Sequence, residues 1–306
     1  MSGKKNARGA FNDGSPWAEL MGEVQQDPLR RQKIIGRIEA HLGAKVVTLF
    51  TAFGIPSGII SDQEAEMLEN VLSAECKQEQ PLVLIINSPG GMALAAERIA
   101  NVCRAYSVGD CYRVIVPHMA KSAATMVCFG AAEIMMSKTA ELGPVDPQVP
   151  FTDDRGNQAW ISAEEYLRSY DSLMKGATGA LNERLEPYLQ QLQRYDSRYV
   201  EQLRSAQQLA RDISVRLLKS GMLKSSSESE ILTKIDMFLT QAAKSSHGRM
   251  IAAAEASTCG LTVNMIDLKS ELWRDVWSLY VRSDWSVSQQ YATLVESTSA
   301  SVVKPR

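Results

Sequence analysis

The sequence predicts an α/β fold built on a parallel sheet, and three observations predict it. Short apolar segments of strand length recur along the first half of the chain, at 45–50, 82–86, 114–116 and 133–136. Apolar residues return at helical spacing between and after them, over 61–74, 92–106 and 123–132. Strands that alternate with helices in this way pair in parallel through right-handed crossovers.

The first two strands and the helix between them follow from local residue types. The segment from Lys45 to Phe50 is short and rich in β-branched residues, which favour strands. Ser61 followed by Glu64 is a capping pair, so a helix is expected to begin there. The run from Leu82 to Ile86 is continuously apolar, which is typical of a strand buried on both faces.

A glycine turn and a serine turn follow two neighbouring strands. The strand at 82–86 ends in the turn Asn87-Ser88-Pro89-Gly90-Gly91, and the strand at 114–116 leads to Lys121 and Ser122. A serine at a strand-to-helix turn beside a glycine turn is a layout for acyl transfer. The sequence therefore makes Ser122 a candidate nucleophile. The alternative is that Ser122 only caps the helix that follows it.

Main-chain amides at these two turns are the candidate oxyanion donors. Gly90 and Gly91 carry no Cβ, so their backbone can approach a carbonyl oxygen closely. The amide of Ala123 lies in the first turn of a helix, where no intrahelical acceptor is available. Together these groups can stabilise an oxyanion beside Ser122. The alternative for the glycines is a tight turn without a chemical role.

Three motifs together resemble one superfamily. They are Asn87-Ser88-Pro89-Gly90-Gly91, Ala120-Lys121-Ser122-Ala123-Ala124-Thr125-Met126 and Glu141-Leu142-Gly143-Pro144-Val145-Asp146-Pro147-Gln148. The chain resembles the ClpP/crotonase superfamily, and within it the serine dehydrogenase proteinase family, related to ClpP and signal-peptide-peptidase-A serine peptidases. The resemblance covers roughly 45–148 and resumes weakly over 248–263. It implies a ClpP/crotonase-like spiral of ββα units with an inserted helical segment.

The catalytic base is where the sequence departs from the ClpP pattern. The loop that carries the family's histidine holds Asp146 here, and the segment that carries the family's acid includes Lys244 and His247. Histidine and acid can have exchanged places, giving Ser122, Asp146 and His247, because a triad depends on geometry and not on chain order.

Other bases remain open. A serine–lysine dyad, as the resemblance to signal peptide peptidase A implies, has candidates in Lys121, Lys138, Lys175 and Lys244. A lysine base needs surroundings that favour its neutral form. His118 precedes Ser122 closely and is a further candidate. The last alternative is that no functional base exists.

The pattern divides the chain into six predicted segments. These are a disordered tail at 1–16, an N-terminal helical segment at 17–43, a ClpP/crotonase-like core at 44–160, a helical insertion at 161–243, the C-terminal part of the core at 244–285 and a mobile tail at 286–306.

Bulk composition narrows the class of protein. A formal net charge of −2 argues against a general nucleic-acid binder. The 5 cysteines have no metal-like spacing and fit a reducing compartment. No signal peptide or membrane-spanning run is found, so a cytoplasmic protein without a metal or cofactor is expected.

The predicted function is that of a serine peptidase or amide hydrolase acting through an acyl-enzyme on Ser122. One alternative is a catalytically silent ClpP-like scaffold, and a less favoured one is a crotonase-like acyl-CoA enzyme. The resemblance implies a homo-oligomer and a peptide or protein substrate. Because the sequence has no phosphate-binding Walker loop, any ATP-driven unfolding would require a separate ATPase partner.

Overall fold

The structure is a computed structural model that describes residues 16, 20, 28–75, 80–152, 156, 158–179, 185–239 and 249–306. Its centre is a seven-stranded sheet with the order β10-β5-β3-β2-β1-β11-β12. The strands are β1 (Lys45–Thr51), β2 (Leu82–Asn87), β3 (Tyr112–Val116), β5 (Glu133–Met136), β10 (Val263–Met265), β11 (Tyr291–Glu296) and β12 (Ser301–Pro305). The first five are parallel to one another, whereas β11 is antiparallel to β1 and β12 is antiparallel to β11. The predicted α/β class and strand direction are therefore confirmed.

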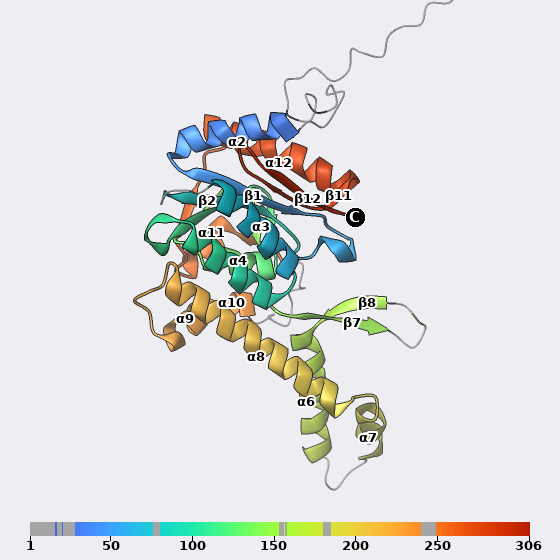
Figure 1. The fold of residues 1–306 in the computed structure, drawn as a ribbon. Coiled ribbons are helices and arrows are strands. Elements are labelled where there is room, and N and C mark those ends of the chain that lie inside the picture. Colours follow the sequence, from blue (N-terminus) through green and yellow to red (C-terminus); the bar gives the residue numbers. More distant parts are fainter. Residues whose placement is uncertain are drawn as a thin grey trace, which may run out of the picture.

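Helices cover both faces of this sheet (Figure 1). One face carries α3 (Asp62–Glu75), α4 (Ala93–Ala105) and α5 (Ala123–Phe129), and the other carries α2 (Pro28–Leu42) and α12 (Glu271–Gln289). Alternate residues of each central strand enter the two apolar cores, as the pleat requires. In β1, Val47 and Leu49 face the α3–α5 side, whereas Val46 and Phe50 face the α2–α12 side.

The predicted start of the second helix is confirmed in detail. The Glu64 carboxylate accepts hydrogen bonds from the Ser61 amide at 2.8 Å and from the Ser61 hydroxyl at 2.6 Å. Two short 3-10 helices, η1 (Pro56–Gly58) and η2 (Val108–Asp110), lie in connecting loops. Among the described residues, no helix combines the length and the apolar character needed to cross a bilayer.

The C-terminal residues 286–306 are not the mobile tail that the sequence predicts. The end of α12 leads into β11, which pairs with β1, and β12 then pairs with β11. Glu296 in β11 is buried and accepts a hydrogen bond from the Arg31 guanidinium of α2 at 2.7 Å. The stretch is polar because an edge strand and buried ion pairs require polar residues. That polar composition is also typical of a mobile tail, so the two strands were not predicted.

A helical projection interrupts the core between β6 (Glu141–Leu142) and β9 (Ile251–Ala252) (Figure 1). It begins with the hairpin β7 (Gln148–Thr152) and β8 (Gln158–Ser162), followed by α6 (Ala163–Gly179), α7 (Glu186–Leu192) and α8 (Ser197–Ser220). A small apolar cluster that includes Leu167 and Leu203 holds it together. The C-terminal half of α8 packs on the main core through Leu217 and Leu218. We call β7, β8, α6, α7 and the part of α8 from Ser197 to Arg211 the arm.

The chain returns from α8 to the core through short elements. These are α9 (Glu228–Lys234), α10 (Asp236–Leu239), β9 (Ile251–Ala252) and α11 (Ala253–Thr258). A second, three-stranded sheet of order β4-β6-β9 forms where β6 (Glu141–Leu142) pairs with β4 (Met119–Ala120) on one side and with β9 on the other. This small sheet borders the turn that carries Ser122.

Candidate active site

Ser122 lies between β4 and α5 in an unusual backbone conformation. Its φ is 50° and its ψ is −120°, and α5 begins at the next residue. Positive φ in a residue with a side chain costs roughly 1–3 kcal/mol and is concentrated at functional sites. The Ser122 hydroxyl makes no cap hydrogen bond to the helix, and the residue is partly exposed. The alternative role of a simple helix cap is therefore not supported.

The glycine turn after β2 packs directly against this serine. Gly90 has a φ of 101°, and a Cβ added to it would lie 2.7 Å from the Ser122 Cβ and 2.9 Å from the Ala123 amide nitrogen. A Cβ on Gly91 would overlap the backbone of Ile60. Both positions thus require glycine because the space of a side chain is taken by neighbouring backbone.

Main-chain hydrogen bonds bring the two turns together. The Ser88 amide donates to the Met119 carbonyl at 3.1 Å, and the Lys121 amide donates to the Ser88 carbonyl at 3.1 Å. The Asn87 side chain accepts from the Met119 amide at 3.0 Å. The end of β2 is therefore fixed beside β4, which sets Ser122 next to the glycines.

The amides around Ser122 differ in their hydrogen bonding. The Gly90 amide donates to the Ser88 hydroxyl at 3.1 Å, and that hydroxyl shares a 2.8 Å hydrogen bond with Thr51. Within the described part of the chain, no group accepts a hydrogen bond from the Gly91 amide or the Ala123 amide. Two of the three predicted donors are thus free for a ligand, whereas Gly90 supplies the close approach of the backbone.

Thr125 links the helix after Ser122 to the next loop. Its hydroxyl contacts the Ala120 carbonyl at 2.7 Å and the Gly143 carbonyl at 2.9 Å, and it accepts from the Gly143 amide at 3.2 Å. Sequence reasoning missed Thr125, Ser88 and Thr51 as parts of the site, because short hydroxyl residues carry no signal of their partners in another segment.

Lys121 is held in an ion pair beside the site. Its Nζ lies 2.5 Å from the Glu141 carboxylate and contacts the carbonyls of Leu142 at 3.3 Å and Arg249 at 3.4 Å. These acceptors occupy the donor hydrogens of a charged ammonium. Gly143 leaves room for the lysine, since a Cβ there would overlap the Lys121 side chain.

The other candidates for the catalytic base that the structure describes are two exposed lysines and a histidine packed against α12. Lys138 is exposed in the loop after β5, and Lys175 is exposed on α6 of the arm. His118 shares a 3.1 Å hydrogen bond through Nδ1 with the Tyr280 hydroxyl, and the two rings lie 5.3 Å apart. Burial raises the pKa of Tyr280. His118 is thus packed against α12.

The loop that carries Asp146 is anchored to the end of the helical insertion. Asp146 is 2% exposed, and the neighbouring Val145 amide donates to the Phe238 carbonyl in α10 at 2.9 Å. Lys244 and His247 lie outside the described residues. The described residues that flank residues 240–248 contact the surroundings of the site. Phe238, before this stretch, accepts the hydrogen bond from Val145, and Arg249, after it, accepts one from Lys121.

Comparisons with known proteins match the first half of the chain to one family. The family model of the ClpP-like SDH-type serine proteinases matches residues 18–153. The uncharacterized protein MJ0137 of Methanocaldococcus jannaschii is 36% identical over 134 residues, which are 42% of this chain and 46% of that protein. The uncharacterized protein MJ1495 of the same organism is 34% identical over 129 residues, 40% of this chain and 43% of that protein. The match thus spans less than half of either relative.

Solved structures show weaker likeness. ClpP1 from Listeria monocytogenes is 11% identical with a TM-score of 0.40, and the match covers 77% of this chain and 96% of that one. A mutant of the 1510-N membrane-bound stomatin-specific protease, in complex with a substrate peptide, is 14% identical with a TM-score of 0.30. That match covers 78% of this chain and 96% of the other. The family model carries the comparison: the resemblance noted in the sequence is confirmed over residues 18–153, which match the model of the ClpP-like SDH-type serine proteinases.

Proposed function

We propose that the chain is a serine peptidase that cleaves an amide through an acyl-enzyme on Ser122. The observation that carries the proposal is the approach of Gly90 to Ser122, with two unengaged amides beside the serine. Backbone amides that are already in place when charge develops on a carbonyl oxygen stabilise it without reorganisation. The family match over residues 18–153 supports the same reaction class.

The proposed reaction has two steps. Ser122 Oγ bonds to the carbonyl carbon of the substrate while a base takes its proton, and the amides of Gly91 and Ala123 donate to the oxyanion. The C–N bond then breaks, and the amine leaves with that proton. In the second step water attacks the ester, and the peptide acid leaves as Ser122 regains its hydrogen.

For the base we propose His247 with Asp146 as its partner, and Lys244 as the rival. The carboxylate of Asp146 is buried in a loop that contacts α10, immediately before the stretch that contains both candidates. Lys121 is better suited to bracing the turn, because Glu141 and two carbonyls occupy its ammonium. Alanine at His247 should abolish acylation, whereas alanine at Lys244 should leave it within about threefold. The opposite outcome would assign the base to Lys244.

Labelling with a serine-reactive fluorophosphonate tests the nucleophile. We expect the full chain to be labelled and Ser122→Ala not to be. Ser73→Ala is the matched control, because Ser73 lies exposed on α3 and its hydroxyl donates to the Asn70 carbonyl within the same helix. Equal labelling of wild type and Ser122→Ala would exclude Ser122. Labelling of none of the proteins, with folding intact, would favour the silent scaffold instead.

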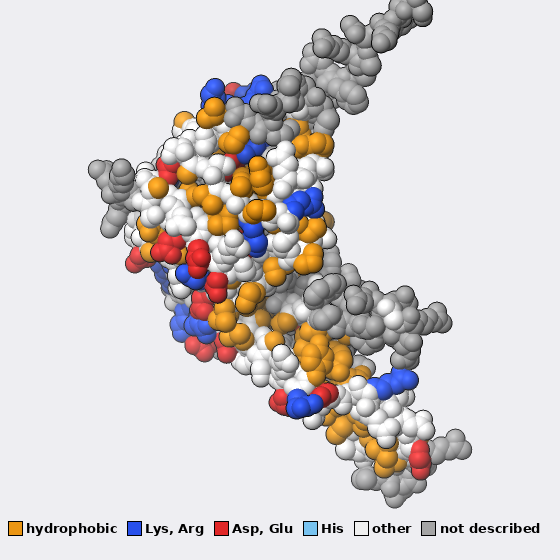
Figure 2. All heavy atoms as spheres, turned by 45° about the vertical axis from the view of Figure 1, so that its right-hand side comes forward, with side chains coloured by type: hydrophobic (Ala, Val, Ile, Leu, Met, Phe, Trp, Pro, Cys, Tyr) orange, Lys and Arg blue, Asp and Glu red, His pale blue; other side chains and the backbone are white. Residues whose placement is uncertain are grey.

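The arm offers a surface for assembly. Figure 2 shows hydrophobic side chains at the surface along it, and Met174, Leu189 and Leu209 are 39%, 47% and 38% exposed. We therefore propose a homo-oligomer that buries part of the arm. Light scattering coupled to size exclusion should give a mass above that of one chain. A monomer at micromolar concentration would contradict this, whatever the outcome of the labelling.

A further inference from the structure

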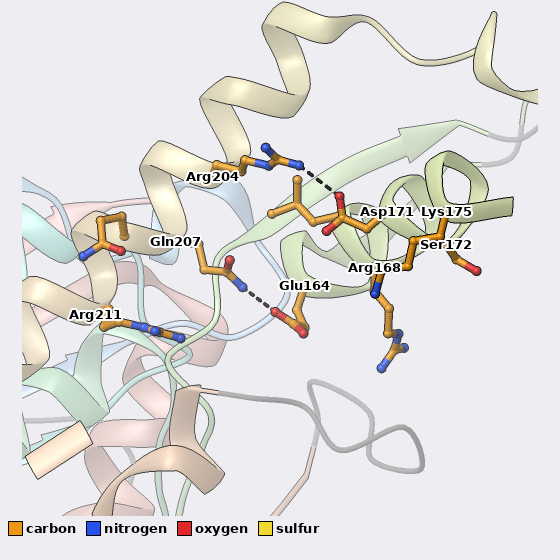
Figure 3. Close-up of a pocket in the computed structure, with 10 residues that line it drawn as sticks. Glu164, Arg168, Asp171, Ser172, Lys175, Arg204, Gln207 and Arg211 are labelled. Carbon is orange, nitrogen blue, oxygen red and sulfur yellow. Dashed lines mark hydrogen bonds and ion pairs between the residues drawn. The ribbon is translucent and has the colours of Figure 1, made fainter. Parts of the chain in front are cut away.

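A groove on the arm has a volume of about 580 Å³ (Figure 3). It lies between α6 and α8, and four basic side chains line it together with two carboxylates: Arg168, Lys175, Arg204, Arg211, Glu164 and Asp171. We call this the arm groove. It is formed by different elements from those that position Ser122, so any ligand it takes is bound separately from the reacting atoms.

The two carboxylates of the arm groove are used within it. Asp171 accepts a hydrogen bond from the Arg204 guanidinium at 2.9 Å, and Glu164 accepts one from the side-chain amide of Gln207 at 2.5 Å (Figure 3). Both bonds join α6 to α8 and hold the two walls of the groove together. Asp171 is paired with the cation Arg204, whereas Glu164 keeps its charge because Gln207 is neutral.

The four positive side chains of the arm groove outnumber its two carboxylates. No acidic side chain in the described ranges forms an ion pair with Arg168, Lys175 or Arg211. Arg168 and Lys175 are exposed, and Arg211 is partly exposed. The groove therefore has an excess of positive charge on a chain whose formal net charge is −2. Such local excess attracts anions and steers them to the surface.

The arrangement of these cations selects the shape of the anion. Arg168 and Lys175 lie two helical turns apart, about 10 Å along α6, and Figure 3 shows them and Arg211 at separate points around the groove. A single phosphate needs donors that converge within hydrogen-bond distance of one centre. Cations that are spread along a groove instead match a ligand with several separated charges, such as an extended peptide, whose alternate side chains are about 7 Å apart. Leu167 adds an apolar contact to the lining.

We propose that the arm groove binds an acidic peptide segment in extended conformation. Glutamate and aspartate side chains of the peptide pair with Arg168, Lys175 and Arg211 in turn. If the chain is the peptidase proposed above, such a site raises its affinity for proteins with acidic stretches. The binding itself does not use Ser122, so the two proposals can fail separately.

The test is fluorescence anisotropy with the full-length Ser122→Ala protein and a labelled peptide of about eight residues rich in glutamate, aspartate and leucine. We expect binding that weakens as salt is raised. The double reversal Arg168→Glu/Arg211→Glu should weaken it by roughly tenfold or more. The matched control is Lys219→Glu/Arg274→Glu, which makes the same charge change at exposed sites outside the groove. It should change the affinity by less than about twofold.

Each other outcome overturns the proposal. If the acidic peptide does not bind the Ser122→Ala protein, whose groove residues are unchanged, the proposal is wrong. Equal weakening in the control variant would mean that general charge, and not the groove, attracts the peptide. Binding of a basic peptide of the same length and composition in leucine would mean apolar adsorption. Tighter binding of an oligonucleotide of equal charge, lost in the groove variant, would assign the groove to nucleic acid.

Discussion

Gly90 and Ser122 are in direct backbone contact although they come from different strand–helix units. A Cβ at Gly90 would lie 2.7 Å from the Ser122 Cβ and 2.5 Å from the Lys121 carbonyl oxygen. This contact couples the glycine turn to the serine turn. Glycine is required at position 90 because residues of the serine turn occupy the space of a side chain there.

Gly90→Ala should remove acylation of Ser122. The new methyl group must displace the serine turn, and the backbone at φ 101° disfavours any residue with a side chain. The free energy of unfolding should fall by about 1–3 kcal/mol, and the fluorophosphonate labelling rate by roughly 100-fold or more. Urea unfolding and labelling kinetics measure both effects.

The matched control for that change is Gly36→Ala in α2. A Cβ there would lie an ordinary 3.7 Å from Thr298, within a helix interior. Alanine should raise the free energy of unfolding by about 0.5–1 kcal/mol and leave labelling unchanged. Unchanged labelling in Gly90→Ala would mean that the turn tolerates the methyl group and that the close approach has no catalytic role.

Thr125→Val should loosen the loop at 143–148 from α5. Valine has the same shape but leaves the buried Gly143 amide without its acceptor, at a cost of about 1–3 kcal/mol in the free energy of unfolding. Thr125→Ser keeps the hydroxyl and should retain most of the labelling rate. If the serine variant labels as slowly as the valine variant, then the methyl group of Thr125, and not its hydrogen bonds, matters to the site.

Lys121→Met and Glu141→Gln should have similar effects on stability and labelling. Both changes break one 2.5 Å ion pair, so the double variant should be little worse than either single variant, with a coupling energy of about 1 kcal/mol. A bracing role predicts that labelling survives in all three. Complete loss in Lys121→Met alone, with Glu141→Gln still active, would instead make Lys121 the base.

Glu75 should make the fold sensitive to acid. Burial raises its pKa, but hydrogen bonds from Lys45, Ser299 and Ser297 outweigh this and lower the pKa from 4.5 to about 2. Glu75 then contributes stability that is fully present above about pH 4.5 and is lost as the pH falls through about 2.

The measurement is urea unfolding at pH 7, 4 and 3. Stability should fall with pH less steeply in Glu75→Gln than in wild type. Glu69→Gln, an exposed glutamate on the same helix, is the control and should follow wild type. Parallel curves for wild type and Glu75→Gln would show that other groups carry the acid sensitivity.

The parallel half of the sheet was predictable because its signals are local. Apolar runs such as that from Leu82 to Ile86, and capping pairs such as Ser61 with Glu64, predict a strand or a helix start from a few neighbouring residues. Strands β11 and β12 were not predictable in this way, because β11 pairs with a strand more than two hundred residues earlier and is stabilised by Arg31 of α2. Local composition carries no trace of such a partner.

The same division holds for the candidate site. The sequence alone determined that a serine and a glycine pair end neighbouring strands, since residue type and strand order suffice for that. Only the tertiary structure decided that the Gly90 amide is used by Ser88, that Lys121 is held by Glu141, and that Lys175 lies on the arm. These facts depend on distances between segments far apart in the chain, and such distances are set by packing.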